Sequence, residues 1–127
     1  FHRFLRAIRK KQPITLYGNG EQTRDFTFID DIVSATIAAS SQGRPGSVYN
    51  IGGGSRVSVN QVIELMAAQT GNIPLINPEA PQKGDMRNTY ADTTLARSEL
   101  NFVPSVKLED GIRAEYEWLK KEPELGS

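Results

Sequence analysis

Residues 16–31 constrain the fold of this chain more than any other stretch, because four structural signals follow one another there without a gap. A strand-like run that ends at Tyr17 leads into the Gly18-Asn19-Gly20 turn. An extended run of β-branched and aromatic residues occupies 23–28, and the acidic pair Asp30-Asp31 can cap a helix. Short strands that alternate with helices predict an α/β (α+β-like) domain, and not a complete doubly wound sheet.

Periodic patterns predict the remaining elements. Apolar spacing predicts helices at 1–11, 32–41, 58–70, 92–100 and 108–121, and strands at 14–17, 47–51 and 73–76. The third helix has the clearest limits, since Ser58 and Gln61 form a capping-box pattern and Gly71 can end the helix. Residues 77–89 form a predicted loop, and such long loops are often functional. We expect one domain over 1–121 and a frayed tail over 122–127.

Composition excludes several classes of function. The chain has 127 residues, enough for one domain with a core, and its 15 basic and 15 acidic residues favour neither nucleic acid nor an anionic membrane as a partner. The basic positions between residues 3 and 11 leave a nucleic-acid binder as a remote alternative. The chain has no cysteine, which excludes disulfides and thiolate zinc sites. The single histidine, His2, is expected at the surface, and no residue spacing predicts a metal site. No apolar run approaches the roughly 18 residues of a membrane span. The absence of cysteine fits a reducing compartment, so the expected location is the cytoplasm.

A second block, residues 82–92, reads Gln-Lys-Gly-Asp-Met-Arg-Asn-Thr-Tyr-Ala-Asp. The two blocks, in this order, resemble the substrate half of the extended short-chain dehydrogenase/reductases, the NAD-dependent epimerases and dehydratases of nucleotide sugars. The resemblance runs over about 1–121 and is greatest to the UDP-glucuronate and UDP-glucose 4-epimerases. It corresponds to the C-terminal part of that family. It therefore implies that NAD and the catalytic groups belong to an N-terminal half outside this chain.

The resemblance also implies a set of contacts to a UDP-sugar. Arg24 would clamp the diphosphate, and a guanidinium suits that role because its fork meets two phosphate oxygens at once. The backbone of residues 14–17 would read the uracil edge, with Tyr17 beside the base. Asp85 would accept hydrogen bonds from the ribose hydroxyls. Asn60 lies near the position of an asparagine that contacts the diphosphate in some dehydratases.

Position 82 departs from part of the family. Several epimerases have an arginine there for a second phosphate contact, whereas members similar to UDP-glucuronate 4-epimerase often have a glutamine, as this chain does at Gln82. Lys83 or Arg87 can supply the missing charge. The departure favours the glucuronate branch.

Two other patterns have structural interpretations. The Gly52-Gly53-Gly54 run fails the dinucleotide fingerprint G-x-G-x-x-G, because Val57 stands where the last glycine is required. A turn or close backbone packing is expected there. Tyr116 and Lys120 match the family's Tyr-x-x-x-Lys catalytic signature, but the resemblance places the true signature upstream. Tyr116 and Trp118 are therefore expected to be packing residues.

We therefore expect the UDP-sugar-binding part of an NAD-dependent nucleotide-sugar epimerase, which would invert C4 of the sugar by transient oxidation. The alternatives are a dehydratase or decarboxylase of the same family, and a non-catalytic binding module that kept the fold. NAD is not expected to bind to this chain alone, which is also expected to be inactive. The parent enzyme is expected to be a homodimer that associates through its other half, which leaves a monomer open for this chain. Arg24 and Asp85 are expected to face one cavity.

Overall fold

The computed structural model describes residues 1–54 and 56–122, and these form two compact units. The first unit comprises Phe1–Gln22, Ser58–Arg87 and the chain from Glu109, and the second comprises Thr23–Val57 and Asn88–Leu108. Both units combine helices with short strands, which confirms the predicted α/β class without a complete doubly wound sheet. The single domain expected over 1–121 stays a prediction. Residues 123–127 of the expected frayed tail lie outside the described residues.

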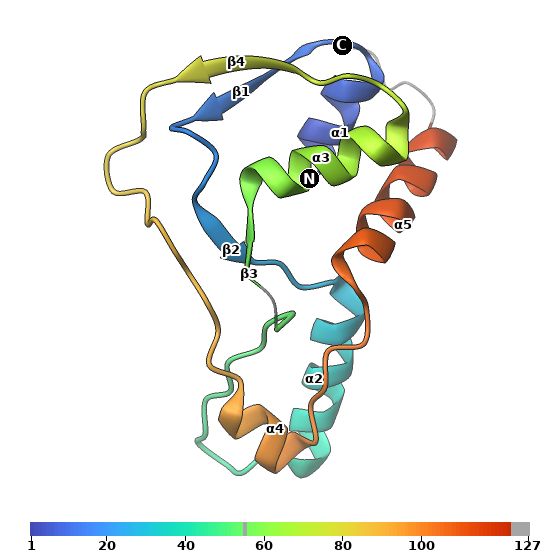
Figure 1. Ribbon diagram of the computed structural model, residues 1–127. Coiled ribbons are helices and arrows are strands. Elements are labelled where there is room, and N and C mark those ends of the chain that lie inside the picture. Colours follow the sequence, from blue (N-terminus) through green and yellow to red (C-terminus); the bar gives the residue numbers. More distant parts are fainter. Residues whose placement is uncertain (55, 123–127) are drawn as a thin grey trace. The chain divides into compact units, whose positions relative to one another are not determined.

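The first unit contains a small parallel sheet at its edge, with α1 and α3 to one side of it (Figure 1). Its elements are α1 (His2–Arg9), β1 (Pro13–Tyr17), α3 (Val59–Thr70), β4 (Leu75–Glu79) and α5 (Leu108–Lys121). Strands β1 and β4 pair in parallel, with Pro13 opposite Leu75 and Tyr17 opposite Glu79. The apolar side chains buried in this unit come from α1, β1, α3 and α5, and they are Leu5, Ile8, Ile14, Leu16, Val62, Ile63, Met66, Ile112 and Leu119.

Helix α3 has the limits that its sequence predicts. The Ser58 hydroxyl accepts a hydrogen bond from the Gln61 backbone N–H at 3.1 Å, and the Gln61 side chain accepts one from the Ser58 N–H at 2.9 Å. This reciprocal pair satisfies two N–H groups that a helix start otherwise leaves without a partner. Gly71 ends the helix in the left-handed conformation, with a φ of 69°. Both predicted boundaries are confirmed.

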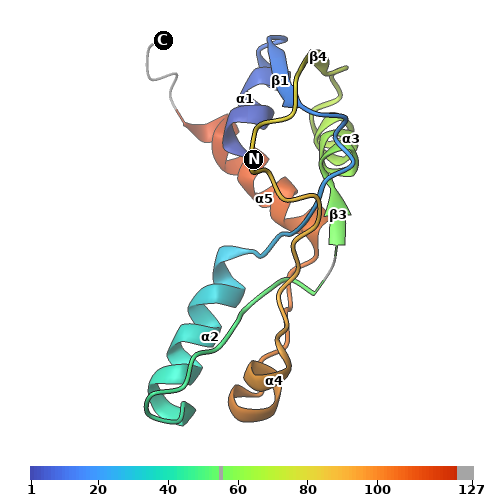
Figure 2. The same ribbon diagram turned by 90° about the vertical axis from the view of Figure 1, so that its left-hand side faces the viewer.

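The second unit packs α2 (Ile29–Gln42) beside α4 (Thr94–Leu100), as Figure 2 shows. Its core consists of Ala35, Ala96, Leu100 and Phe102. Tyr49 and Ile51 pack against this core from the segment that connects α2 to the next strand. The unit also holds β2 (Thr23–Asp25), which pairs with β3 (Arg56–Ser58), a strand whose last residue, Ser58, belongs to the first unit.

The strand predictions are less accurate than the helix predictions. Residues 47–51, predicted as a strand, form none in the structure, and the extended run predicted over 23–28 is a strand only over Thr23–Asp25. The strand predicted at 73–76 begins at Leu75 and continues to Glu79, so the loop starts at residue 80, three residues later than the predicted 77. Strand β3 was not predicted. A strand exists only where a neighbouring strand pairs with it, and a local pattern does not reveal that neighbour.

The prediction that Asp30 or Asp31 caps a helix is wrong. Helix α2 has Phe28 at its N-cap, without a side-chain cap. The carboxylate of Asp31 is instead buried, and it accepts hydrogen bonds from the Ser105 N–H at 2.9 Å, the Ser105 hydroxyl at 2.7 Å and the Val106 N–H at 3.3 Å. Burial raises the pKa of this carboxyl, but the three hydrogen bonds outweigh burial, so the pKa lies below its ordinary value. Asp31 thereby fastens α2 to the segment before α5.

Among the residues that the structure describes, no helix is both long enough and apolar enough to cross a bilayer.

Candidate functional site

The Gly18-Asn19-Gly20 turn is fixed to the N-terminal end of α3. The Asn60 backbone N–H donates to the Gly20 carbonyl at 3.0 Å, and the Asn60 side-chain amide donates to the Asn19 carbonyl at 3.0 Å. Gly20 has a φ of 74°, and a Cβ atom at this position would collide with the Asn60 Oδ1 atom. Any other residue would therefore strain the backbone and displace the Asn60 side chain. Asn60, which the resemblance associates with a diphosphate, uses its side-chain amide to hold the turn.

Hydrogen bonds fix the backbone at Tyr17, the last residue of β1. Its carbonyl accepts a hydrogen bond from the Gln22 side-chain amide at 3.0 Å, while the Gly18 N–H donates to the Glu79 carbonyl at 3.0 Å. The Gln22 carbonyl in turn accepts a hydrogen bond from the Val59 N–H at 3.2 Å. The Tyr17 side chain is 42% exposed. The backbone around Tyr17 is therefore fixed, while the ring stays accessible to a planar ligand.

The two sequence blocks meet on either side of Arg24. The Thr23 hydroxyl donates to the Asn88 side-chain carbonyl at 2.7 Å, and the Thr89 N–H donates to the Thr23 carbonyl at 3.2 Å. On the other side, the carboxylate of Asp25 accepts a hydrogen bond from the Ala91 N–H at 3.4 Å. The second block thus runs along the strand that carries Arg24.

Arg24 itself is half-buried on β2, and its guanidinium donates to the Thr23 carbonyl at 2.8 Å. Groups on the two neighbours of Arg24, Thr23 and Asp25, hold the second block beside it. The local structure therefore holds an arginine on a short, braced strand.

Gln82 and Asp85 lie in one turn of the first unit. The Asp85 N–H donates to the Gln82 carbonyl at 3.2 Å, and Gly84 between them has a φ of 87°. Both side chains and that of Arg87 are exposed. The structure therefore brings Gln82 and Asp85 together. Arg24 belongs to the second unit, so its predicted place at one cavity with Asp85 stays a prediction.

The triple glycine packs closely against β2, which confirms the structural interpretation. The Gly54 N–H donates to the Asp25 carboxylate at 3.1 Å. A Cβ atom on Gly52 would collide with the same carboxylate, and one on Gly53 would collide with the Phe26 carbonyl. The backbone of these glycines faces the protein where a dinucleotide-binding turn would face a pyrophosphate.

The Tyr-x-x-x-Lys match on α5 has ordinary surface partners. The Lys120 ammonium lies 2.6 Å from the Glu117 carboxylate and 5.2 Å from the centre of the Tyr116 ring. The centre of the Trp118 ring lies 5.7 Å from that of the His2 ring. His2 is exposed, as predicted, and its Nδ1 atom lies 3.1 Å from the Glu115 carboxylate. Within residues 1–54 and 56–122, no group of His, Asp and Glu residues could hold a metal ion.

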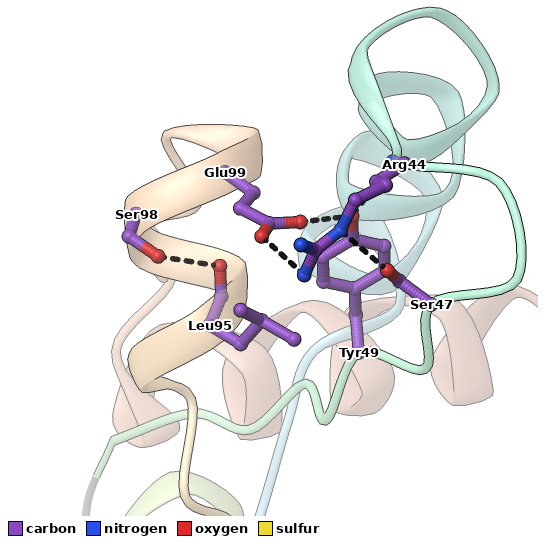
Figure 3. Close-up of polar contacts among 6 residues, drawn as sticks. All are labelled: Arg44, Ser47, Tyr49, Leu95, Ser98 and Glu99. Carbon is purple, nitrogen blue, oxygen red and sulfur yellow. Dashed lines mark hydrogen bonds and ion pairs between the residues drawn. The ribbon is translucent and has the colours of Figure 1, made fainter.

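Sequence reasoning missed a polar cluster in the second unit (Figure 3). The Glu99 carboxylate accepts hydrogen bonds from the Arg44 guanidinium at 2.8 Å and from the Tyr49 hydroxyl at 2.5 Å. The Tyr49 oxygen accepts one from the Arg44 N–H at 2.9 Å, and the Arg44 Nε–H donates to the Ser47 hydroxyl at 3.1 Å. An open hollow of about 290 Å³ lies nearby, lined by Val48, Asn50, Asp92, Thr94, Leu95 and Ser98. Glu99 follows the other members of the cluster by 50 residues or more, so no local pattern indicates the cluster.

Comparison with known proteins places this geometry in a family. The model of the GDP-mannose 4,6 dehydratase family matches residues 2–115. UDP-glucuronate 4-epimerase of Thermodesulfobacterium geofontis (strain OPF15) is 36% identical over 124 residues, which are 97% of this chain and 38% of that protein. dTDP-glucose 4,6-dehydratase of Streptomyces griseus is 34% identical over 123 residues, which are 94% of this chain and 37% of that protein.

A solved structure shares the fold. The UDP-glucuronic acid 4-epimerase from Bacillus cereus, in complex with UDP-glucuronic acid and NAD, matches with a TM-score of 0.89 and 35% sequence identity. The match covers 94% of this chain and 39% of that one. The chain therefore spans less than two fifths of the length of these relatives.

Proposed function

This chain belongs to the GDP-mannose 4,6 dehydratase family, within the NAD-dependent epimerases and dehydratases, and we propose that it is the part that binds the UDP-sugar. The observation that carries the proposal is the meeting of the two sequence blocks beside Arg24. Thr23 and Asp25 brace the strand from both sides, so Arg24 is presented in a defined place. A defined guanidinium favours binding, because less conformational freedom is lost when a phosphate arrives.

The nucleoside would bind at the first unit. Tyr17 offers an accessible ring beside a fixed backbone. Within the described residues, β1 pairs with a single strand, β4, along one of its two edges. Backbone groups on the other edge can therefore pair with the edge of a base. The exposed carboxylate of Asp85 can accept hydrogen bonds from both hydroxyls of a ribose.

UDP-glucuronate is the sugar nucleotide that we propose as the substrate of the whole enzyme. Gln82 stands where several epimerases have an arginine, and the relatives named above include a UDP-glucuronate 4-epimerase and a structure with UDP-glucuronic acid bound. The similarity to dTDP-glucose 4,6-dehydratase keeps dehydration as the second candidate reaction. NAD and the catalytic tyrosine and lysine would belong to the remaining part of the enzyme, because Gly52-Gly53-Gly54 is packed against β2.

A calorimetric titration of the chain with UDP tests the proposal. We expect weak binding, because this chain would supply only one wall of the cleft. Arg24→Ala should lower the affinity roughly ten- to hundred-fold, which corresponds to the loss of a charged hydrogen bond of about 1.5–3 kcal/mol. Arg24→Lys should recover part of the loss, since lysine keeps the charge but lacks the fork.

Arg113→Ala is the matched control. Arg113 lies on α5, is exposed and pairs with Asp110 at 3.2 Å, so its removal subtracts the same charge far from the proposed contacts in sequence. It should change the UDP affinity less than two-fold. An Arg24→Ala chain that binds UDP as tightly as the parent chain would refute the phosphate role.

A further inference from the structure

Asp25 joins β2 to two other segments of the second unit. One of its carboxylate oxygens accepts a hydrogen bond from the Gly54 N–H at 3.1 Å, and the other accepts one from the Ala91 N–H at 3.4 Å. The first N–H belongs to the Gly52-Gly53-Gly54 run and the second to the second sequence block. A single carboxylate therefore connects three segments that meet only in the folded chain.

The glycine run leaves room for this carboxylate. A Cβ atom on Gly52 would collide with the Asp25 carboxylate and with the Ala91 side chain, and one on Gly53 would collide with the Phe26 carbonyl. Neither glycine has a left-handed backbone, so these two positions require the absence of a side chain and not an unusual conformation. The run therefore admits the Asp25 carboxylate between itself and the second block.

The carboxylate of Asp25 and the guanidinium of Arg24 start from neighbouring residues of the same short strand. Successive side chains of a strand point to opposite faces, so the two groups leave β2 on opposite sides. Both carboxylate oxygens accept from backbone N–H groups. Asp25 thus fixes the stretch of backbone from which the Arg24 side chain extends.

Other contacts hold the same segments together without Asp25. The Arg56 guanidinium carbon lies 4.7 Å from the centre of the Tyr90 ring, which joins β3 to the second block by a cation–π contact. The Thr23 hydroxyl donates to the Asn88 side chain at 2.7 Å. A substitution at Asp25 is therefore expected to alter the strand locally and to leave the unit folded.

We propose that Asp25 is a positioning residue for diphosphate binding, and that Gly52 serves the same purpose by admitting its carboxylate. The carboxylate sets where β2 lies between the glycine run and the second block, and so where Arg24 presents its guanidinium. The inference rests on the proposed function, because the position of Arg24 matters only if Arg24 binds the diphosphate. Asp25 itself touches no ligand in this arrangement.

Calorimetric titrations of the chain with UDP and with uridine test the proposal. Asp25→Asn should lower the affinity for UDP roughly three- to ten-fold, because its amide offers one acceptor instead of two and Arg24 must then be ordered when the ligand binds. The affinity for uridine should not change, since uridine lacks the phosphates. A general loss of structure would instead weaken the binding of both ligands.

A double variant separates positioning from a structural role. If Asp25 acts through the guanidinium, Asp25→Asn should cause no further loss of UDP affinity in a chain that already carries Arg24→Ala. Asp30→Asn is the matched control, because it removes the same charge from an exposed residue of the same unit. It should change the UDP affinity less than about two-fold.

Gly52→Ala disturbs the same contact and leaves Asp25 in place. Its methyl group would displace the carboxylate, so this variant should lose UDP affinity as Asp25→Asn does and keep its affinity for uridine. Gly46→Ala is the control, because Gly46 lies in the same unit and no atom lies within 4 Å of a Cβ placed there. Gly52→Ala decides the question if Asp25→Asn does not fold.

Three results would overturn the proposal. They are an Asp25→Asn chain that binds UDP as tightly as the parent chain, an equal loss of affinity for UDP and uridine, and a loss of the same size with and without Arg24→Ala. The proposed function fails separately, through an unchanged UDP affinity in Arg24→Ala. A loss in Arg24→Ala without a loss in Asp25→Asn would overturn the positioning role alone.

Discussion

At the scale of single residues, Gly20 and Asn60 illustrate how a turn of the proposed site is fixed. The glycine has a positive φ and lies against the side chain of Asn60, which holds the carbonyl of Asn19. Position 20 therefore requires both a left-handed backbone and the absence of a Cβ atom. Gly71 meets only the first demand, because its φ is 69° and no atom lies within 4 Å of a Cβ placed there.

This pair gives a prediction at the same scale. Gly71→Ala should destabilise the first unit by about 1 kcal/mol, the cost of placing alanine in the left-handed region. Gly20→Ala should cost roughly a further 1–3 kcal/mol, because the added methyl group overpacks against Asn60. Urea unfolding followed by the fluorescence of Trp118, which lies in the same unit, measures both. Equal losses for the two variants would contradict the collision.

At the scale of elements, Asp31 ties α2 to the segment before α5 through three hydrogen bonds. Its pKa is lowered in the folded chain, so the contribution of this tie to the free energy of unfolding is fully present above the pKa of the unfolded chain. The contribution is lost as the pH falls through the lower, folded value. The hydrogen bonds of Asp31 are thus expected to stabilise the chain at neutral pH and to lose this effect in acid, from roughly pH 4 downward.

Asp31→Asn tests this tie. The amide cannot accept hydrogen bonds at both ends and places a donor against the donors of Ser105 and Val106, so we expect a loss of roughly 1–3 kcal/mol at pH 7. The difference from the parent chain should shrink as the pH falls below about 4. Asp30→Asn, one residue earlier and exposed, is the control and should cost under about 0.5 kcal/mol. A difference between the parent chain and Asp31→Asn that does not change with pH would contradict the account.

The elements also show how far the sequence predicts this fold. Helix α3 was predicted to within a residue because its cap at Ser58 and its end at Gly71 are local signals. The strand predicted at 47–51 failed because pairing depends on a neighbour, and the role of Asp31 was missed because Ser105 lies 74 residues further along.

In the candidate site, too, local features could be predicted from the sequence and long-range contacts could not. The glycine turn and the packing of Gly52-Gly53-Gly54 followed from local pattern, and the resemblance indicated which residues to consider. Local pattern did not indicate the contact of Asn60 with the turn, nor the cluster of Arg44, Tyr49 and Glu99. Each of these joins residues that lie far apart in the chain.

At the scale of the whole molecule, the chain is a family member that spans less than two fifths of its relatives. Its triple glycine is used for packing, and its Tyr-x-x-x-Lys match has surface partners. We predict that the chain alone, given NAD and UDP-glucuronate, forms no UDP-galacturonate. Chromatography of the sugar nucleotides after long incubation measures this, with the same assay on the intact gene product as the positive control. Turnover by the chain alone would contradict our proposal that NAD and the catalytic groups belong to the remaining part of the enzyme.

The most direct measurement of the central claim compares uridine with UDP as ligands of the parent chain and of Arg24→Ala. If the guanidinium grips the diphosphate, the parent chain should bind UDP at least ten-fold more tightly than uridine, and Arg24→Ala should bind the two about equally. The affinity for uridine should be the same in both proteins. A preference for UDP over uridine that survives Arg24→Ala would contradict the claim that this arginine binds the phosphates.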